Sequence, residues 1–396
     1  MPSRIYSLLR LFFSRLLQST YRSGRTAFYQ VQRILDGSFG RHEIFLFGEN
    51  VTQEEMSEVA TRMRYYLPGF PERKFHLVSH LPWRALLSLD PLLLFGKSPR
   101  YATSLRKILH NIFSIDYRSY PQDGWEWVRL TNLWHRHRPH VHRARVVFAQ
   151  RVEALKDQKL NKSYIFGTGP SLEKAIDRDW SDGYRIVSNT IARDPVLWKH
   201  LNPQFIVAAD AIYHFGHTSF AEAFRRDLRA RLSETQTFFV YPDFFDAIVQ
   251  REFSCFSDRL IPVPAGTSQD VCIDLCKSFE LPNLGNVLPL LLLPLGCTLS
   301  RTVYLWGFDG RAPSDKLFWS NSSKHSYQEL IPGIENAHPC FFQHYVPKND
   351  PNKYARKYHG DVLESRLSAA EKNGYRFVML HPSWTPALQK RYLDES

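Results

Sequence analysis

The stretch Ser163-Tyr-Ile-Phe-Gly-Thr-Gly-Pro-Ser-Leu172 joins a short apolar run to two glycines, a proline and a serine. This order predicts a buried strand, a tight turn and the start of a helix, because proline suits a first helical turn and serine satisfies amides there. Glycine lets a backbone approach a ligand closely, and free amides at a helix start favour an anion such as phosphate. The hypothesis is a phosphate-binding bend, and the alternative is an ordinary tight turn.

Strand-like runs recur on the C-terminal side of this bend, at residues 184–187, 204–209, 237–240, 259–263, 302–306 and 376–380. Helix-like stretches separate them, which is typical of a parallel α/β sheet. Ligands of open α/β sheets bind beyond the carboxyl ends of the strands. Gly167, Asn189, Asp210 and Gly307 all follow such ends, so we expect them to converge on one site.

The rest of the chain divides by pattern into three further segments. Residues 1–35 form a basic amphipathic segment, residues 36–120 alternate strand and helix patterns as in a smaller α/β domain, and residues 121–160 form a helical connector. Residues 161–396 are then the larger α/β domain. The expected architecture is a parallel-sheet domain preceded by a smaller one.

The composition permits a large folded interior and a negatively charged partner. Of 396 residues, 43% are hydrophobic and 14% aromatic, which excludes a disordered chain. The net charge of +12 favours nucleic acid, anionic lipid or acidic substrates such as nucleotide sugars. No nucleic-acid-binding motif is present, so we expect no nucleic-acid partner. Five cysteines without a CxxC pair indicate buried thiols in a reducing compartment.

The first 35 residues carry apolar side chains broken by Arg4, Arg10 and Arg15. A signal peptide has an unbroken apolar run, and a transmembrane helix has about 20 apolar residues. The segment instead fits a basic amphipathic helix on an anionic membrane face. The alternative is a helix packed on its own domain.

Two short motifs raise the question of a metal site. Four histidines lie in residues 135–142, but Pro139 interrupts their helical spacing and no carboxylate or cysteine accompanies them, which favours a basic surface. Asp177-Arg-Asp179 matches D-x-D formally, yet we expect it at the end of a helix and not after a strand. The sequence therefore predicts no metal site.

Residues 163 to about 390 resemble the bacterial sialyltransferases of glycosyltransferase family 42 and their relatives in polysaccharide synthesis. The resemblance is carried by Gly167-Thr-Gly-Pro-Ser-Leu172, Ser188-Asn189 and Val303-Tyr-Leu-Trp-Gly-Phe-Asp309, together with downstream histidines. The G-x-G-P-S-L start is shared with hydroxymethylpterin diphosphokinase-like proteins. The resemblance implies a variant Rossmann (GT-A-like) domain.

It also implies metal-independent, inverting transfer of sialic acid or a related sugar from a nucleotide-sugar donor, here a CMP-sugar, to a cell-surface glycan or lipid-linked acceptor. The nucleotide-sugar is a co-substrate, and no cofactor is implied. A cytoplasmic enzyme, peripheral on the inner membrane face, fits the basic N-terminus. The resemblance implies donor-binding roles for the bend and the strand ends: Gly167, Thr168, Gly169, Pro170, Ser171, Asn189, Asp210, Asn286, Gly307 and Asp309.

The resemblance further implies a histidine base and tyrosine hydroxyls on the leaving phosphate. His359, before Gly360-Asp361, is the first candidate base, and His338 and His344 are the alternatives. Arg311 stands where the family has a tyrosine and could stabilise the phosphate by charge-assisted bonds. Tyr327 could supply a phenol. Departures from the family pattern, including a threonine for an asparagine in the bend, leave the identity of the sugar open.

Two other functions remain open from the sequence. A pyrophosphokinase would use ATP and magnesium and would need clustered carboxylates, of which Asp210 and Asp309 stand near strand ends. A non-catalytic nucleotide-binding protein would need neither a base nor a metal. Titration with CMP, UDP and ATP, with and without magnesium, separates the three.

Overall fold

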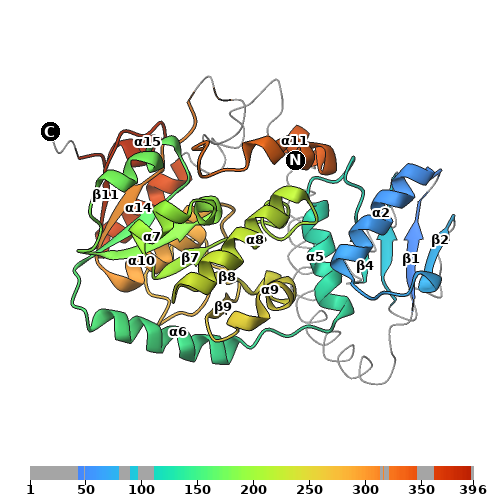
Figure 1. Cartoon of the computed structure of the whole chain (residues 1–396), viewed down its shortest axis with the longest axis horizontal. Helices are drawn as coiled ribbons and strands as arrows, with labels where there is room; N and C mark the ends of the chain where they lie inside the picture. Colours follow the sequence, from blue (N-terminus) through green and yellow to red (C-terminus); the bar gives the residue numbers. More distant parts are fainter. Residues whose placement is uncertain are drawn as a thin grey trace, which may run out of the picture. The chain divides into compact units, whose positions relative to one another are not determined.

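The computed structural model describes residues 43–48, 50–79, 90–96, 111–312, 315, 321–345 and 361–393 (Figure 1). The expected amphipathic segment 1–35 and the candidate base His359 lie outside these residues. The chain forms two compact units, the first spanning residues 1–56 and 69–114 and the second 57–68 and 115–396. The stretch expected as a connector, 121–160, belongs to the second unit.

The first unit contains a four-stranded parallel sheet in the order β2-β1-β3-β4. Its strands are β1 (Ile44–Phe47), β2 (Phe75–Val78), β3 (Leu92–Leu94) and β4 (Ile112–Ser114), with the short η1 (Glu72–Lys74) before β2. Helix α2 (Gln53–Tyr66) begins here at a capping box, in which the side chains of Thr52 and Glu55 each accept from the other's backbone amide.

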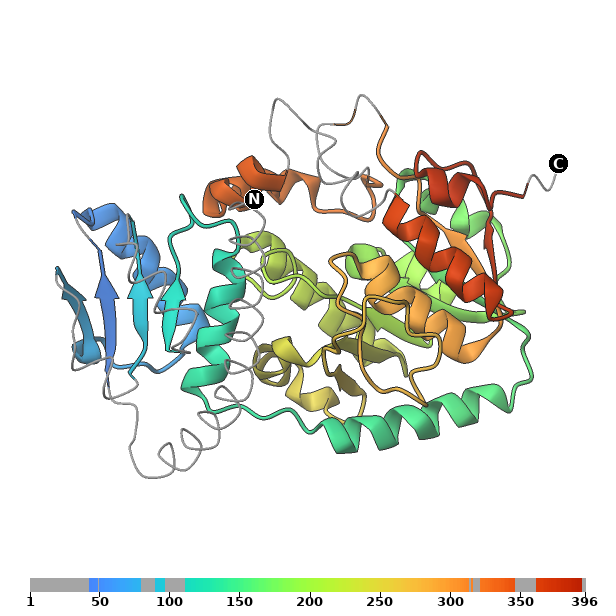
Figure 2. The same ribbon diagram turned by 180° about the vertical axis from the view of Figure 1, so that it is seen from behind.

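The second unit is built on a seven-stranded sheet in the order β11-β10-β5-β6-β7-β8-β9, and every neighbouring pair is parallel (Figure 2). The chain starts at β5, moves outward to β9, and then returns to the other side of β5. The strands are β5 (Lys162–Phe166), β6 (Tyr184–Ser188), β7 (Phe205–Val207), β8 (Phe238–Pro242), β9 (Leu260–Val263), β10 (Thr302–Trp306) and β11 (Arg376–Met379).

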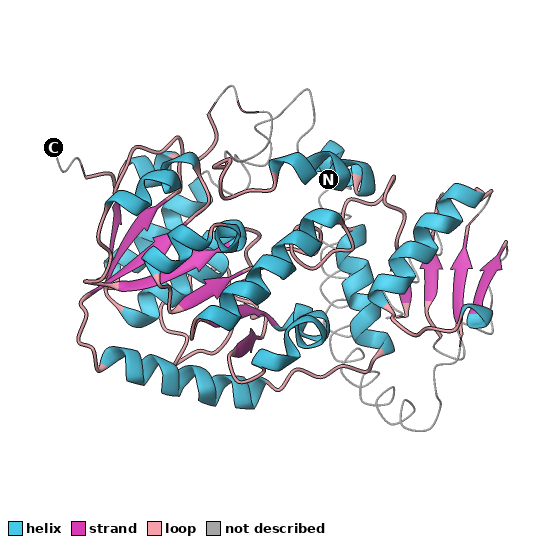
Figure 3. Cartoon of the chain, in the orientation of Figure 1, coloured by secondary structure: helices cyan, strands magenta, loops and turns pink. Residues whose placement is uncertain are grey.

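Helices cover both faces of this sheet, because successive strand residues point to opposite sides and both sets are apolar (Figure 3). The described helices before β10 are α5 (Asp123–Trp134), α6 (Val141–Lys156), η2 (Pro170–Asp177), η3 (Asn189–Arg193), α7 (Pro195–Leu201), α8 (Ser219–Glu234), η4 (Asp243–Phe245), α9 (Asp246–Phe253), η5 (Ser254–Phe256), η6 (Leu288–Leu292) and α10 (Leu293–Leu299). Those after it are η7 (Gln328–Leu330), α11 (Ile331–Ala337), α12 (Pro339–Tyr345), α14 (Asp361–Lys372) and α15 (Pro386–Gln389).

One face of the sheet packs against α6, α10 and α14, whose apolar residues share a single buried cluster with alternate strand residues. The opposite face packs against aromatic side chains. Trp180 meets Phe166 of β5 edge-on with ring centres 5.0 Å apart, and Phe253 of α9 meets Phe239 of β8 at 5.8 Å. The second unit is therefore a three-layer α/β structure.

The expected fold class is confirmed: the chain is α/β, with parallel sheets flanked by helices in a Rossmann-like arrangement. Strand order reverses at β5, because its two neighbours, β6 and β10, are reached in opposite directions. Such a reversal opens a crevice at the carboxyl ends of the central strands. Within the described part of the chain, no helix combines the length and apolarity needed to cross a bilayer.

Candidate functional site

The carboxyl ends of β5 and β10 lie against each other at the point where strand order reverses. The Gly167 amide donates to the Trp306 carbonyl and the Gly169 amide to the Gly307 carbonyl, both at 2.8 Å. A Cβ on Gly167 would lie 2.5 Å from the Gly307 oxygen, and Gly307 itself has φ +79°. These glycines are therefore needed first for the close contact of two strand ends.

An internal carboxylate lies at the start of η2. The Ser171 amide donates to both Asp309 oxygens, at 3.1 and 3.2 Å, and the Ser171 hydroxyl donates to Oδ2 at 2.8 Å. The chain thus supplies an anion where the sequence predicted a ligand phosphate. Within the described bend 167–171, the Thr168 amide is the backbone N–H without a partner. This differs from the expected cradle, in which several amides face a ligand.

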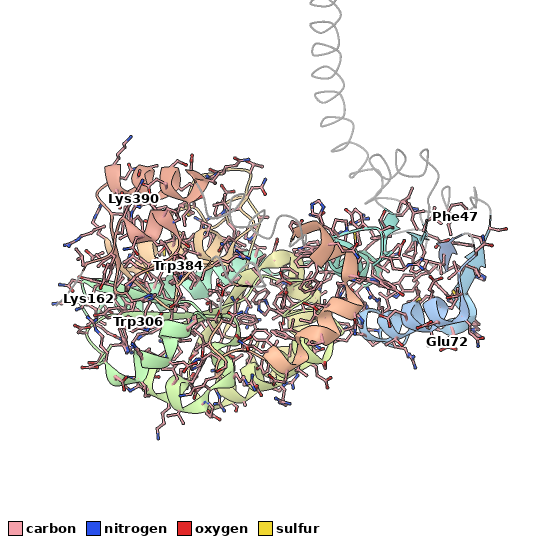
Figure 4. The ribbon with its side chains drawn as sticks, turned by 90° about the horizontal axis from the view of Figure 1, so that it is seen from above. Phe47, Glu72, Lys162, Trp306, Trp384 and Lys390 are labelled. Carbon is pink, nitrogen blue, oxygen red and sulfur yellow. The ribbon has the colours of Figure 1, made fainter. Side chains whose placement is uncertain are left out.

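His381 joins the two strand ends from the end of β11. Its Nε2 accepts from the Gly307 amide at 2.9 Å and lies 2.8 Å from the Ser171 hydroxyl, while Nδ1 donates to the carbonyl of the next residue. Burial lowers the pKa of His381, although the nearby Asp309 carboxylate opposes this. The Trp306 indole, labelled in Figure 4, donates to the Ser171 carbonyl at 2.9 Å. Asp309, His381 and Trp306 therefore all form hydrogen bonds to Ser171 of the bend.

A cavity of about 740 Å³ opens beside this bend, within the second unit. Pro170 and Ser171 are the two predicted donor-binding residues that do not line it. The others all do, and they come from four strand ends and from the start of η6: Gly167, Thr168, Gly169, Asn189, Asp210, Asn286, Gly307 and Asp309. The topology therefore brings together residues that lie far apart in the sequence.

The described lining of the cavity combines apolar side chains, such as Trp125 and Phe308, with polar ones, and it contains no lysine or arginine. Its two carboxylates, Asp210 and Asp309, both accept from backbone amides of the chain. The remaining polar groups are mostly amides and hydroxyls, among them Asn283, Asn321 and Ser326. The described walls can therefore recognise a ligand through neutral hydrogen bonds and apolar contacts.

Asn189, at the end of β6, carries one sign of a ligand-binding role. Its backbone has φ 51°, in the left-handed region that non-glycine residues rarely adopt, and its Oδ1 is buried without a hydrogen-bond partner among the described residues. Asparagine tolerates the left-handed backbone, so the sign is the acceptor. An unsatisfied buried acceptor costs about 1–3 kcal/mol, and this cost is removed if Oδ1 accepts a hydrogen bond from a ligand in the cavity.

Asp210 and His214 form a closed turn after β7. Asp210 Oδ1 accepts from the amides of Ile212 and Tyr213 at 2.8 and 2.9 Å, and its own amide donates to Nδ1 of His214 at 3.2 Å. Burial raises the pKa of Asp210 and lowers that of His214 to about 3. His214 was not predicted as a site residue from the sequence. Its position, four residues after the aspartate that follows a strand, could have indicated that it lies at the same edge of the sheet.

The remaining walls come from segments far along the chain. Asn286 Oδ1 accepts from the amide of Leu288, the first residue of η6, at 2.8 Å, and Asn286 also lines the cavity. The Thr168 hydroxyl donates to Asn321 Oδ1 at 2.7 Å, and the Ser322 amide donates to the Thr168 carbonyl at 2.8 Å. These bonds fix the segment that begins at residue 321 to the end of β5.

A serine, a histidine and an aspartate in this region have the connectivity of a hydrolase triad. His325 lies 2.8 Å from the Ser322 hydroxyl and 3.1 Å from Asp194 Oδ2. Ser322 and His325 are both only 1% exposed, and the Ser322 hydroxyl also contacts Glu173 at 2.7 Å. Because a substrate cannot reach this hydroxyl, we interpret the group as an anchor and not as a nucleophile.

The structure places the described histidine candidates away from the cavity walls. His338 is fully buried, and its Nδ1 lies 2.8 Å from Asp123 Oδ2. Burial raises the pKa of Asp123, but the charges and hydrogen bonds of His338 and Arg62 outweigh this and lower it. His344 is exposed on α12 and is not among the described lining residues.

The two candidates for phosphate stabilisation are likewise outside the described lining. The Tyr327 hydroxyl donates to Asp227 at 2.6 Å, and burial raises the pKa of Tyr327. The Arg311 guanidinium donates to the carbonyls of Ala312 and Asp315. Both side chains are therefore bonded to the protein itself.

The motifs considered for a metal have other partners. His137 lies 2.7 Å from Asp246, and Asp179 accepts from the amide and hydroxyl of Ser181. No group of three or more histidine, cysteine, aspartate or glutamate residues is arranged for a metal ion in the described ranges.

The cysteines are free thiols. The sequence predicted that they are buried, and this is wrong for most of them. Cys297 is buried, Cys255 is exposed, and the other three are partly exposed.

Comparison of the chain with protein-family models, with curated proteins and with solved structures gives no match. The site must therefore be interpreted from its own residues.

Proposed function

We propose that the second unit is a glycosyltransferase that binds a nucleotide-sugar donor, in the first instance a CMP-sugar, in the cavity at the carboxyl ends of β5, β6, β7 and β10. The observation that carries the proposal is that Asn189 lines the cavity and that its buried Oδ1 has no partner among the described residues. The location also supports it, because open α/β sheets bind nucleotides where strand order reverses.

The lining, which combines apolar side chains with neutral polar ones, suits the uncharged part of such a donor. A ribose and a base present hydroxyl, amino and carbonyl groups, which amide side chains both donate to and accept from. Asn189 would take the ribose and base side. The phosphate would lie by the free Thr168 amide.

Transfer by direct displacement needs a base for the acceptor hydroxyl. The acceptor oxygen forms a bond to the anomeric carbon, the bond to the phosphate oxygen breaks, and the base takes the hydroxyl proton. His359 remains the proposed base. A cell-surface glycan or a lipid-linked sugar remains the proposed acceptor, with the basic N-terminal segment proposed to hold the enzyme on an anionic membrane face.

Calorimetric titration tests the donor site directly. Wild-type protein should bind CMP without metal, and UDP and ATP should bind more weakly. Asn189→Gly keeps a residue that tolerates the left-handed backbone but removes the amide. It should therefore weaken CMP binding at least about tenfold, the equivalent of one hydrogen bond of about 1.4 kcal/mol.

Asn202→Gly is the matched control. Asn202 also has a left-handed backbone, with φ 43°, and it ends α7 away from this cavity. Its substitution should leave CMP affinity unchanged. Magnesium-dependent ATP binding in place of CMP binding would support the pyrophosphokinase alternative, and equal losses in both variants would contradict a ligand contact by Asn189.

A further inference from the structure

The turn that follows β7 gives His214 an unusual chemical state. Its imidazole is buried, with 6% of the residue exposed, and it lies against Phe224 with ring centres 4.6 Å apart. His214 also lines the cavity. Two ring nitrogens are available for hydrogen bonds, and the surrounding backbone determines the state of one of them.

Nδ1 of His214 faces a donor. The Asp210 amide points at it from 3.2 Å, and the backbone amide of His214 returns a bond to the Asp210 carbonyl, also at 3.2 Å. A backbone amide can only donate, so Nδ1 must present a lone pair. The proton of a neutral imidazole is then on Nε2, because the two nitrogens share one proton.

The same contact disfavours the charged imidazolium. A second proton on Nδ1 would direct an N–H group against the Asp210 N–H and break the bond. The charged side chains near His214 do not stabilise its imidazolium form. The Asp210 carboxylate accepts from two backbone amides, and Arg225 donates to the His214 and Gly216 carbonyls. Burial acts in the same direction, since it lowers the pKa of His214 to about 3.

Nε2 is the part of the ring left for a ligand. Among the described residues, no group lies within hydrogen-bond distance of it, and it is not one of the fully enclosed unpaired atoms. Asn189, at the end of the neighbouring strand β6, lines the same cavity, and its enclosed Oδ1 is an acceptor without a partner among the described residues. Adjacent strand ends therefore carry one donor and one acceptor that the described residues do not use.

We propose that His214 is a binding residue that stays neutral and donates a hydrogen bond from Nε2 to an acceptor atom of the nucleoside part of the ligand, in the cavity that Asn189 also lines. The complementary ligand carries both a hydrogen-bond acceptor and a donor. A ribosyl diol and the amino-pyrimidine edge of a base both have this chemistry. The proposal rests on the proposed nucleotide site, and it adds the residue and its tautomer.

Three variants separate the functions of the ring. His214→Asn retains an acceptor near the position of Nδ1 but has no donor that reaches as far as Nε2. His214→Gln places an amide N–H near the position of Nε2 and loses the bond to Asp210. His214→Phe retains the ring contact with Phe224 and loses both polar atoms.

The expected affinities for CMP follow from this comparison. His214→Asn should fold as the wild type does and lose at least about tenfold in affinity. His214→Gln should recover part of that loss, and His214→Phe should recover none. Cytidine and ribose 5-phosphate show whether His214 contacts the ribose or the base. If it contacts the ribose, His214→Asn should weaken the binding of both compounds. If it contacts the base, His214→Asn should weaken the binding of cytidine alone. Equal CMP affinity of His214→Asn and wild type would overturn the proposal.

Nitrogen NMR of the ring gives a readout that needs no ligand. The His214 signals should show protonated Nε2 and bare Nδ1 from about pH 8 to about pH 5, and CMP should shift the Nε2 proton. An Nδ1-protonated tautomer, or an imidazolium at about pH 6, would overturn the fixed donor. If the tautomer is as proposed but no mononucleotide binds, the proposed function fails and the assignment of the ring remains.

Discussion

At the scale of single residues, the glycines at the strand ends mainly contact one another and the segment that ends at Asp309. A Cβ on Gly169 would lie 2.0 Å from Asp309 Oδ2 and 2.8 Å from the Gly307 carbonyl. The bend was predicted to contain glycine because a ligand must come close. The structure shows a second requirement, because the end of β10 and the Asp309 carboxylate both lie against the bend. These partners are distant in the chain, so the sequence around residue 167 does not reveal them.

Gly169→Ala should destabilise the second unit by about 1–3 kcal/mol, the usual cost of forcing a methyl group into packed space. Asp309 would have to move, and its bonds to Ser171 would weaken. Urea unfolding followed by tryptophan fluorescence measures the effect, since the buried Trp180 and Trp198 both belong to the second unit.

Gly333→Ala is the control with the opposite sign. Gly333 lies in α11, and the nearest atom to a Cβ there is the Ser219 hydroxyl at 3.7 Å. Alanine in a helix is favoured over glycine by about 0.5–1 kcal/mol, so this variant should be slightly more stable than wild type. Equal stability of the two alanine variants would contradict the packing of Gly169 against Asp309.

At the scale of elements, most strands and helices follow from local pattern. The runs at 184–187, 302–306 and 376–379 are strands, and the apolar stretch 288–299 is one of the helical stretches that separate them. Most residues placed at strand ends by this reasoning do line one cavity. Local pattern could not predict which side chains lie next to each strand end. The pairing of His338 with Asp123 depends on side chains many residues apart, and the fixed turn of His214 depends on the direction of one hydrogen bond.

The N-cap of α7 links an element boundary to the site. Asp194 Oδ1 accepts from the amides of Val196 and Leu197 at 2.8 and 3.0 Å, while Oδ2 faces His325 at 3.1 Å. His325 in turn contacts Ser322, whose amide donates to a carbonyl of the bend beside the cavity. One carboxylate therefore caps a helix and supports a segment of the cavity wall.

Asp194→Ala should cost more than the loss of an ordinary cap, which is worth about 1 kcal/mol. The substitution removes two amide bonds and leaves the buried His325 without its carboxylate partner. Thr218→Ala is the comparison, because Thr218 caps α8 through a single bond of 3.4 Å to the Ala221 amide. Urea midpoints should fall further for Asp194→Ala, and CMP affinity should fall only in that variant. The reverse order of midpoints would contradict this account.

At the scale of the whole molecule, buried histidines couple the second unit's stability to pH. His217 lies between Glu58 at 3.2 Å and the ring of His338, with ring centres 5.7 Å apart, and Arg62 stands beside Glu58. Burial outweighs the bond to Glu58 and lowers the pKa of His217 to about 4. Burial also lowers the pKa of His214, to about 3. Both side chains are therefore neutral in the folded protein above about pH 5.

The direction of the pH effect follows from these lowered values. An unfolded histidine has a pKa of about 6.5 and takes up a proton as the pH falls below that value. The folded His214 and His217 do not, so the unfolded chain binds more protons and stability decreases. Their contribution is complete above about pH 6.5 and is lost progressively toward their folded pKa values. Asp210, whose pKa is raised by burial, acts in the opposite direction at lower pH.

The free energy of unfolding should therefore fall from about pH 6.5 to about pH 5, with each of the two histidines contributing about 2 kcal/mol at most over this interval. Urea unfolding across this range measures the slope. His214→Asn and His214→Phe should differ in stability at neutral pH, because only one of them keeps the bond to Asp210, yet they should share the same reduced slope, because neither side chain titrates. A wild-type slope in both variants would show that His214 takes up its proton in the folded protein.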